Sequence, residues 1–200
     1  RPTESWLPIG AWDACNDPEA ELVPREPTWV GIDMALKHDS IAVVAVQKND
    51  DGKFVAEAQI WLPDGNMIDV AVVENHIRDL HQRYECVELC YDPAFFERSA
   101  QALADEGLAM VEFPQSSQRM VPACQRAYEI ICAGSMTHAG SPIFSDQVLS
   151  AAPRQTNEGW RLSKGKAKRK IDAAIALVMA LDRASRPPVQ EGAELWLSFE

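Results

Sequence analysis

The hydrophobic positions in the first third of the chain predict three consecutive strands. Residues 29–34 and 40–47 are short and almost continuously apolar, which is typical of buried strands. A polar turn sequence, Asn-Asp-Asp-Gly, follows at 49–52. Residues 54–62 then alternate between apolar and polar positions, as in a strand with one covered face. We therefore expect an antiparallel meander of three strands.

Strands and helices alternate in the rest of the chain. Apolar residues at helical spacing mark the helices, and Pro93 and Gly107 mark the start and end of one of them. The expected elements are a helix over 68–84, a strand over 86–91, a helix over 93–107, a strand over 109–113, a helix over 120–133, a short helix near 146–152, a hairpin over 159–170 turning at 164–166, and a helix over 171–184. This order predicts an α/β fold with a mixed central sheet, in which three antiparallel strands are followed by parallel strands and helices cover both faces. The ribonuclease H-like architecture has the same order of elements.

The two ends of the chain differ from its middle. Residues 1–27 contain five prolines and no sustained period, which predicts a linker or an arm packed on another part of the protein. Residues 185–200 are expected to form a C-terminal tail. The folded domain is expected to span residues 28–184.

The formal net charge of −11 argues against a nucleic-acid-binding protein, because such proteins usually carry a basic excess. The distribution of charge changes this picture, since residues 161–170 contain six basic side chains and no acidic one. The residues of this basic strip are Arg161, Lys164, Lys166, Lys168, Arg169 and Lys170. An acidic protein with one basic strip can still hold a phosphate backbone locally. A solvated loop is the alternative interpretation.

Apolar runs and cysteines argue against two further classes. No apolar run is long enough to span a bilayer, so no membrane association is expected. The five cysteines are odd in number and lie in apolar stretches, as reduced, buried thiols do. Cys86 and Cys90 have no second pair at ligand spacing, which argues against a zinc site.

Three aspartates are the candidate catalytic residues, although each has an ordinary structural explanation. Asp33 ends an apolar run, where a buried carboxylate needs a partner, and the alternative is that it caps a turn. Asp92 stands between a strand and Pro93, as a helix N-cap does. Asp172 lies in the first turn of the last helix, where a negative charge is favourable.

Taken together, the three aspartates fit one geometry. If the first and fourth strands are neighbours, Asp33 and Asp92 lie at adjacent strand ends, and the last helix brings Asp172 to the same point. Three carboxylates at short range repel one another unless cations lie between them. Mg²⁺ and Mn²⁺ prefer oxygen ligands, and a pair of such ions is the usual arrangement for phosphodiester hydrolysis. We therefore expect a metal-dependent enzyme that hydrolyses phosphodiester bonds.

The chain resembles the C-terminal nuclease domain of tailed-phage large terminase subunits. The resemblance rests on Gly31-Ile32-Asp33 with Asp39 six residues further on, on Tyr91-Asp92-Pro93, and on Lys170-Ile171-Asp172-Ala173-Ala174. Phe113-Pro114-Gln115 and the run 128–144 also match, so that the resemblance covers residues 29–184. The order and spacing of these motifs are more specific than any one of them.

This resemblance implies an endonuclease of the ribonuclease H-like fold that cuts concatemeric viral DNA at the start and end of packaging. It implies that Asp33, Asp92 and Asp172 bind the metal ions. Asp39 matches a further carboxylate near the metals, and the alternative for it is a turn residue. The implied partners are double-stranded DNA, the terminase ATPase domain, the small terminase subunit and the portal, and the implied location is the host cytoplasm.

The resemblance also bears on the ends of the chain and on the basic strip. The sequence has no phosphate-binding loop of a packaging ATPase, so we expect an excised domain whose residues 1–27 are the linker from that motor. The strip directly precedes Asp172 and is expected to hold the DNA backbone through charge alone, with little sequence preference. Lys168 or Lys170 could also stabilise charge in the transition state. His38 and His138 are weaker candidates for the site, because lone histidines are more often structural or solvated.

Three alternatives remain open. A junction resolvase or transposase-like nuclease shares the chemistry and differs in the DNA that it recognises. An actin-like or sugar-kinase-like phosphotransferase also begins with a Gly-Ile-Asp strand, but it needs a glycine-rich turn, and residues 34–38 contain no glycine. A docking domain with an inactive site is the third alternative, and the presence of all three aspartates argues against it.

Overall fold

The computed structural model describes residues 4–34 and 40–186. The strands are β1 (Pro27–Met34), β2 (Ile41–Lys48), β3 (Phe54–Trp61), β4 (Glu85–Tyr91), β5 (Met110–Glu112), β6 (Met136–His138), β7 (Ala151–Thr156) and β8 (Gly159–Lys164). The helices are α1 (Val70–Arg83), α2 (Pro93–Asp105), α3 (Ser117–Cys132), α4 (Pro142–Leu149) and α5 (Asp172–Ala184), and η1 (Asp13–Cys15) is a short 3₁₀ helix. Four helices begin after a side chain that accepts a backbone hydrogen bond in the first turn, namely Asp69, Asp92, Ser116 and Ser141.

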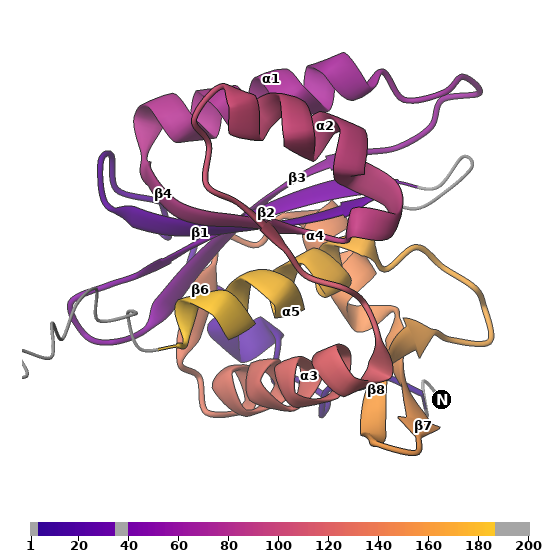
Figure 1. The fold of residues 1–200 in the computed structure, drawn as a ribbon. Helices are drawn as coiled ribbons and strands as arrows, with labels where there is room; N and C mark the ends of the chain where they lie inside the picture. Colours follow the sequence, from indigo (N-terminus) through magenta and orange to yellow (C-terminus); the bar gives the residue numbers. More distant parts are fainter. Residues whose placement is uncertain (1–3, 35–39, 187–200) are drawn as a thin grey trace, which may run out of the picture.

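Six strands form one mixed sheet in the order β5-β4-β1-β2-β3-β6. β2 is antiparallel to β1 and to β3, and the other neighbouring pairs are parallel. α1 and α2 cover one face of the sheet, and α3, α4 and α5 cover the other (Figure 1). The predicted fold class, with three antiparallel strands followed by parallel strands and helices on both faces, is confirmed.

Both faces of the sheet are buried, which explains the continuous apolar run in β2. Ala42, Val44 and Val46 belong to the core on the side of α3, α4 and α5. Ile41 and Val43 belong to the core on the side of α1 and α2. Because successive side chains of a strand point to opposite faces, neither set of positions can be polar.

Gly31 in β1 allows α5 to lie directly on the sheet. A Cβ atom at position 31 would lie 2.1 Å from the carbonyl oxygen of Ala176 and 3.1 Å from the amide nitrogen of Ala180. Two nonbonded heavy atoms do not approach to 2.1 Å, so only glycine fits here without moving the helix. The sequence of α5 is rich in alanine and nearly all of it is buried, which suits this close approach.

Residues 4–26 form an arm that packs against α4 and β6. Trp6 donates a hydrogen bond from Nε1 to the carbonyl oxygen of Val148 at 2.8 Å. Trp12 donates one to Oγ of Ser145 at 2.9 Å, and its ring stacks on His138 with 4.0 Å between the ring centroids. Both indoles are buried. The predicted role of this segment as a linker from an ATPase domain stays a prediction.

The hairpin near the end of the chain lies earlier than the sequence indicated. The prediction of a hairpin over 159–170 with its turn at 164–166 is wrong, because β7 pairs with β8 and places Thr156 opposite Gly159. Thr156 Oγ1 donates to the carbonyl of Gly159 and accepts from the amide of Glu158, which closes the turn. Gly159 adopts a φ of 133° there, which other residues rarely do. Residues 165–171 therefore lead to α5 without forming a strand.

Two shorter elements also differ from the prediction. The helix expected near 146–152 is α4, which begins after its N-cap Ser141 and ends at Leu149. Ala151 and Ala152 consequently start β7. β6 was not predicted, because three residues are too few to show a period.

Two further expectations concerned the cysteines of a possible zinc site and the presence of a membrane-spanning segment. Cys86 and Cys90 lie in β4, and burial raises the pKa of their thiols to about 11 and about 12 respectively. Thiols with such pKa values are protonated and weakly nucleophilic at neutral pH. Among the residues that the structure describes, no helix is long and apolar enough to cross a membrane.

We predict that Gly31→Ala destabilises the fold by on the order of 3 kcal/mol, because the added Cβ forces α5 away from β1. Urea unfolding measures this free energy. Gly165→Ala is the control, since a Cβ at that position meets no atom closer than 3.5 Å. Equal free energies of unfolding for Gly31→Ala and the wild-type chain would contradict the close approach of helix and strand.

We also predict that His138 makes the fold less stable as the pH falls. Burial lowers the pKa of His138, whose Nδ1 accepts a hydrogen bond from Gly140 N. The unfolded chain binds a proton near pH 6.5, while the folded chain binds it only at lower pH, so that stability decreases as the pH falls below about 6.5. His138→Phe retains a ring against Trp12, and its free energy of unfolding should depend less on pH. Urea titrations at about pH 7 and pH 5 test this, and parallel profiles for the two proteins would refute it.

Candidate active site

The three predicted aspartates lie at the same end of the central sheet. β1 and β4 pair in parallel with Ile32 opposite Tyr91, so Asp33 and Asp92, the next residues of the two segments, lie side by side at the carboxyl ends of these strands. The carboxyl ends of parallel strands are where α/β sheets place their sites. Asp172 is the first residue of α5, which lies on β1. Three carboxylates are thus directed to this end of the sheet, one from β1, one that follows β4 and one from α5.

The side chains of Asp33 and Asp172 contact each other. Both are buried, with exposed fractions of 7% and 3%. Burial raises the pKa of Asp33 well above its ordinary value, Asp172 raises it further through its charge and a hydrogen bond between the two side chains, and the charge of Asp92 adds to this. Gln115 opposes the shift, because its Nε2 donates to Oδ1 of Asp33 at 2.7 Å. The raised pKa means that negative charge on Asp33 is poorly compensated.

Asp92 has the structural role that its place before Pro93 indicates. Its Oδ1 accepts a hydrogen bond from Ala94 N at 3.0 Å, which caps α2. The residue is nevertheless buried, and its charge acts on Asp33. Asp92 therefore both caps α2 and lies close to the other carboxylates.

A ring of buried polar groups holds the carboxylate of Asp172. Ser40 donates a short hydrogen bond to Oδ2 of Asp172 and accepts one from Nε2 of Gln147 at 3.2 Å. Oε1 of Gln147 accepts in turn from Ala173 N at 2.8 Å, in the first turn of α5. Ser40 and Gln147 are both buried. The ring thus fixes Asp172 relative to the start of its own helix.

Sequence reasoning missed Ser40, Gln115 and Gln147 as residues of this site. Gln115 was part of a matching motif but had no assigned role. Gln147 lies among apolar residues of α4, and a buried amide in such a helix is a signal for a polar partner. Ser40 gave no local signal. His138, which was a candidate, contacts Trp12 in the arm.

The donor atoms of the site suit a divalent cation. Within residues 4–34 and 40–186, no three His, Cys, Asp or Glu side chains are arranged as the ligands of a metal ion. Asp39 and His38 lie outside the described residues. The oxygens of Asp33 and Asp172, with their poorly compensated charge, are the donors that Mg²⁺ and Mn²⁺ prefer. The assignment of all three aspartates as metal ligands stays a prediction.

Arg161 of the basic strip contacts a residue of the site. It extends from β8 and donates from Nη1 to the carbonyl oxygen of Gln115 at 2.7 Å. Gln115 is the residue that donates to Asp33. Arg161 is therefore connected to Asp33 through Gln115. Its hydrogen bond holds the backbone of the residue that donates to this carboxylate.

Other side chains of the basic strip have acidic partners. Lys166 pairs with Glu4 of the arm at 2.8 Å, and Arg169 pairs with Asp146 of α4 at 2.9 Å. These two acids offset part of the positive charge of the strip, which is therefore less basic than its composition indicated. Its predicted role in DNA binding stays a prediction.

A terminase family matches most of the chain. The family described as "Terminase large subunit, endonuclease domain" matches residues 57–187. The terminase large subunit of Enterobacteria phage HK97 is 22% identical over 214 residues, which covers 92% of this chain and 42% of that protein. Protein YmfN of Escherichia coli (strain K12) is 26% identical over 220 residues, which covers 90% of this chain and 48% of that protein. The chain thus spans less than half the length of these two relatives.

Solved structures of terminases have the same fold as this chain. The crystal structure of the HK97 bacteriophage large terminase matches with a TM-score of 0.80 at 20% identity, over 90% of this chain and 43% of that one. The large terminase nuclease from thermophilic phage G20c with bound magnesium matches with a TM-score of 0.68 at 13% identity, over 90% of this chain and 98% of that one. At such identities the likeness shows the fold alone. The family match extends over more than half of the residues, and this chain accordingly belongs to the endonuclease domains of terminase large subunits.

Proposed function

We propose that this chain is a metal-dependent endonuclease that cuts concatemeric double-stranded viral DNA during genome packaging. The observation that carries the proposal is the contact of two buried carboxylates, Asp33 and Asp172, at the sheet edge where Asp92 also lies. Such a group of acids gains stability from a bound cation. The magnesium bound by the G20c nuclease supports the choice of metal.

Asp33, Asp92 and Asp172 are the proposed ligands of two Mg²⁺ or Mn²⁺ ions. When bound, such ions supply an activated water and neutralise charge on the leaving 3′ oxygen. The protein's own residues set the ligand geometry, since Gln115 orients Asp33 and Ser40 orients Asp172. Hydrogen bonds of this kind limit the motion of ligands and tune their basicity.

The proposed substrate contacts are made to the DNA backbone, which gives little sequence preference. The contributing residues are those of the basic strip, Arg161, Lys164, Lys166, Lys168, Arg169 and Lys170. In the complete terminase we propose the ATPase domain, the small subunit and the portal as partners, with residues 1–27 on the side of the ATPase. Asp39 is a proposed further carboxylate near the ions.

We predict that the chain nicks or cuts plasmid DNA with Mn²⁺ or Mg²⁺ and stops when a chelator is added. Asp33→Asn and Asp92→Asn should each reduce the cleavage rate by about 100-fold or more, since a bound ion contributes several kcal/mol to the transition state. Conversion of supercoiled plasmid measures the rate. Asp79→Asn on α1, where the aspartate pairs with Arg83 away from the sheet edge, is the control. Cleavage by Asp33→Asn at the wild-type rate would exclude the proposed site.

We further predict that replacing Lys166, Lys168 and Lys170 with glutamine weakens DNA binding and flattens its salt dependence. Each lost phosphate contact should lower the slope of log affinity against log salt by about 0.9. Fluorescence anisotropy of a labelled duplex in a chelator measures binding without cleavage. The same charge change at Lys48, Lys53 and Arg78 is the control. Identical salt slopes for both triple variants would mean that the strip does not contact DNA.

A further inference from the structure

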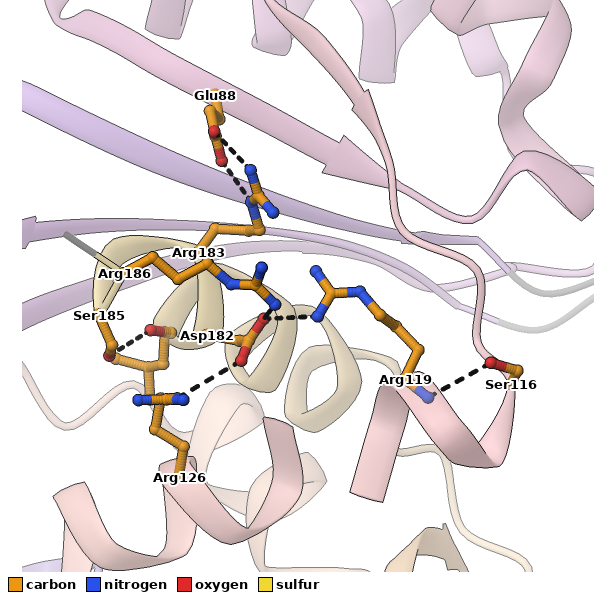
Figure 2. Close-up of polar contacts among 9 residues, drawn as sticks. Glu88, Ser116, Arg119, Arg126, Asp182, Arg183, Ser185 and Arg186 are labelled. Atoms are coloured by element: carbon orange, nitrogen blue, oxygen red, sulfur yellow. Dashed lines mark hydrogen bonds and ion pairs between the residues drawn. The ribbon is translucent and has the colours of Figure 1, made fainter. Parts of the chain in front are cut away.

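A buried aspartate at the far end of α5 holds three arginines. Asp182 is 1% exposed, and its Oδ2 accepts from Nη1 of Arg119 at 3.1 Å and from Nη2 of Arg186 at 3.2 Å. Its Oδ1 lies 3.5 Å from Nε of Arg126. Figure 2 shows the three guanidinium groups converging on this one carboxylate from α3 and from the end of α5. We call these four residues the Asp182 cluster.

One arginine is enough to neutralise Asp182. Arg119 suits this structural role, since it is the least exposed of the three, and its guanidinium lies 4.1 Å from the centre of the Phe113 ring. A neighbouring ion pair, Arg183 with Glu88 at 2.5 and 2.6 Å, is balanced in itself. The Asp182 cluster therefore carries two positive charges more than the fold needs at this point, in a chain whose formal charge is −11.

Arg126 and Arg186 are the two arginines in excess. Each side chain is 45% exposed, and among the described residues each guanidinium has one ionic partner, Asp182. A guanidinium has five N–H donors in a fixed planar arrangement. Most donors of these two groups are therefore available to a ligand, while Asp182 keeps the side chains in place. Ordered, exposed arginines of this kind suit phosphate oxygens, which accept paired hydrogen bonds from them.

The Asp182 cluster lies near enough to the candidate active site to contact the same DNA. Asp172 and Asp182 are ten residues apart on one helix, which corresponds to about 15 Å along its axis. One strand of DNA advances about 3.4 Å per nucleotide, so this length corresponds to roughly four or five nucleotides. Arg119 also follows closely after Gln115, which donates to Asp33.

We propose that Arg126 and Arg186, held by Asp182, bind a backbone phosphate of duplex DNA a few nucleotides from the bond that is cut. This inference rests on the proposed function, since it takes the substrate to be DNA. The contact involves the backbone alone and adds affinity without reading the sequence. It is separate from the basic strip, which lies before the other end of α5.

Binding of a labelled duplex of 30 base pairs in a chelator, followed by anisotropy over a series of salt concentrations, tests the inference. Arg126→Gln/Arg186→Gln should weaken binding by roughly eightfold at 0.1 M salt and lower the salt slope by about 0.9, as expected for one phosphate. Arg126→Lys/Arg186→Lys keeps the charge and should keep the slope. With Mn²⁺, the glutamine variant should need more DNA for half-maximal cleavage, while its rate at saturating DNA stays that of the wild type.

Arg78→Gln/Arg83→Gln on α1 is the matched control, because these arginines also pair with acids and lie on the opposite face of the sheet. Urea unfolding checks that the variants keep their fold, as the Arg119 pair with Asp182 leaves the buried charge neutralised. If the wild type binds and cuts DNA but the cluster variant binds with the control's affinity and slope, the inference is wrong and the proposed function stands. A lysine variant whose salt slope falls as far as that of the glutamine variant would likewise overturn it, because the two lysines keep the charge. A wild-type chain that neither binds nor cuts DNA would overturn both.

Discussion

The packing of α5 on β1 determines where the acidic side chains of the site lie. Gly31 lets the helix backbone rest on the strand, and the parallel pairing of β1 with β4 sets Asp92 beside the strand end. Asp33 and Asp172 are consequently held close together in a buried place, where two negative charges are unfavourable. The apolar surface that α5 buries along its length stabilises the fold against this local cost. Without that helix contact, Asp172 would not meet the two acids that the pairing of β1 with β4 places side by side.

The ends of apolar runs were visible in the sequence and placed Asp33 and Asp92 at strand ends. That these ends are adjacent was a condition of the prediction, which the parallel pairing of β1 with β4 meets. A local pattern could not predict the hydrogen bonds that hold the carboxylate of Asp172. They depend on Ser40 and Gln147, which are 107 residues apart and meet only in the folded chain. The misplaced hairpin has a related cause. A Lys-Gly-Lys sequence resembles a turn, whereas the actual turn depends on hydrogen bonds of Thr156 that no composition rule shows.

Charge in this protein is arranged by tertiary contacts more than by sequence neighbours. Lys166 in the basic strip pairs with Glu4, which is 162 residues away. By contrast, Asp182 pairs with two arginines of α3 and one that follows α5, and these form no run in the sequence. Exposed positive charge therefore lies partly where a linear scan does not find it. A net charge of −11 is compatible with local attraction of an anion for this reason.

The attachment of the arm to α4 connects the amino-terminal segment to the helix that carries Gln147. The indoles of Trp6 and Trp12 are bonded to Val148 and Ser145, on either side of Gln147 in the same short helix. The arm and the amide that donates to Ser40 are therefore attached to the same helix of eight residues. The position of the arm and the hydrogen bonding of Asp172 thus both depend on how this one helix packs.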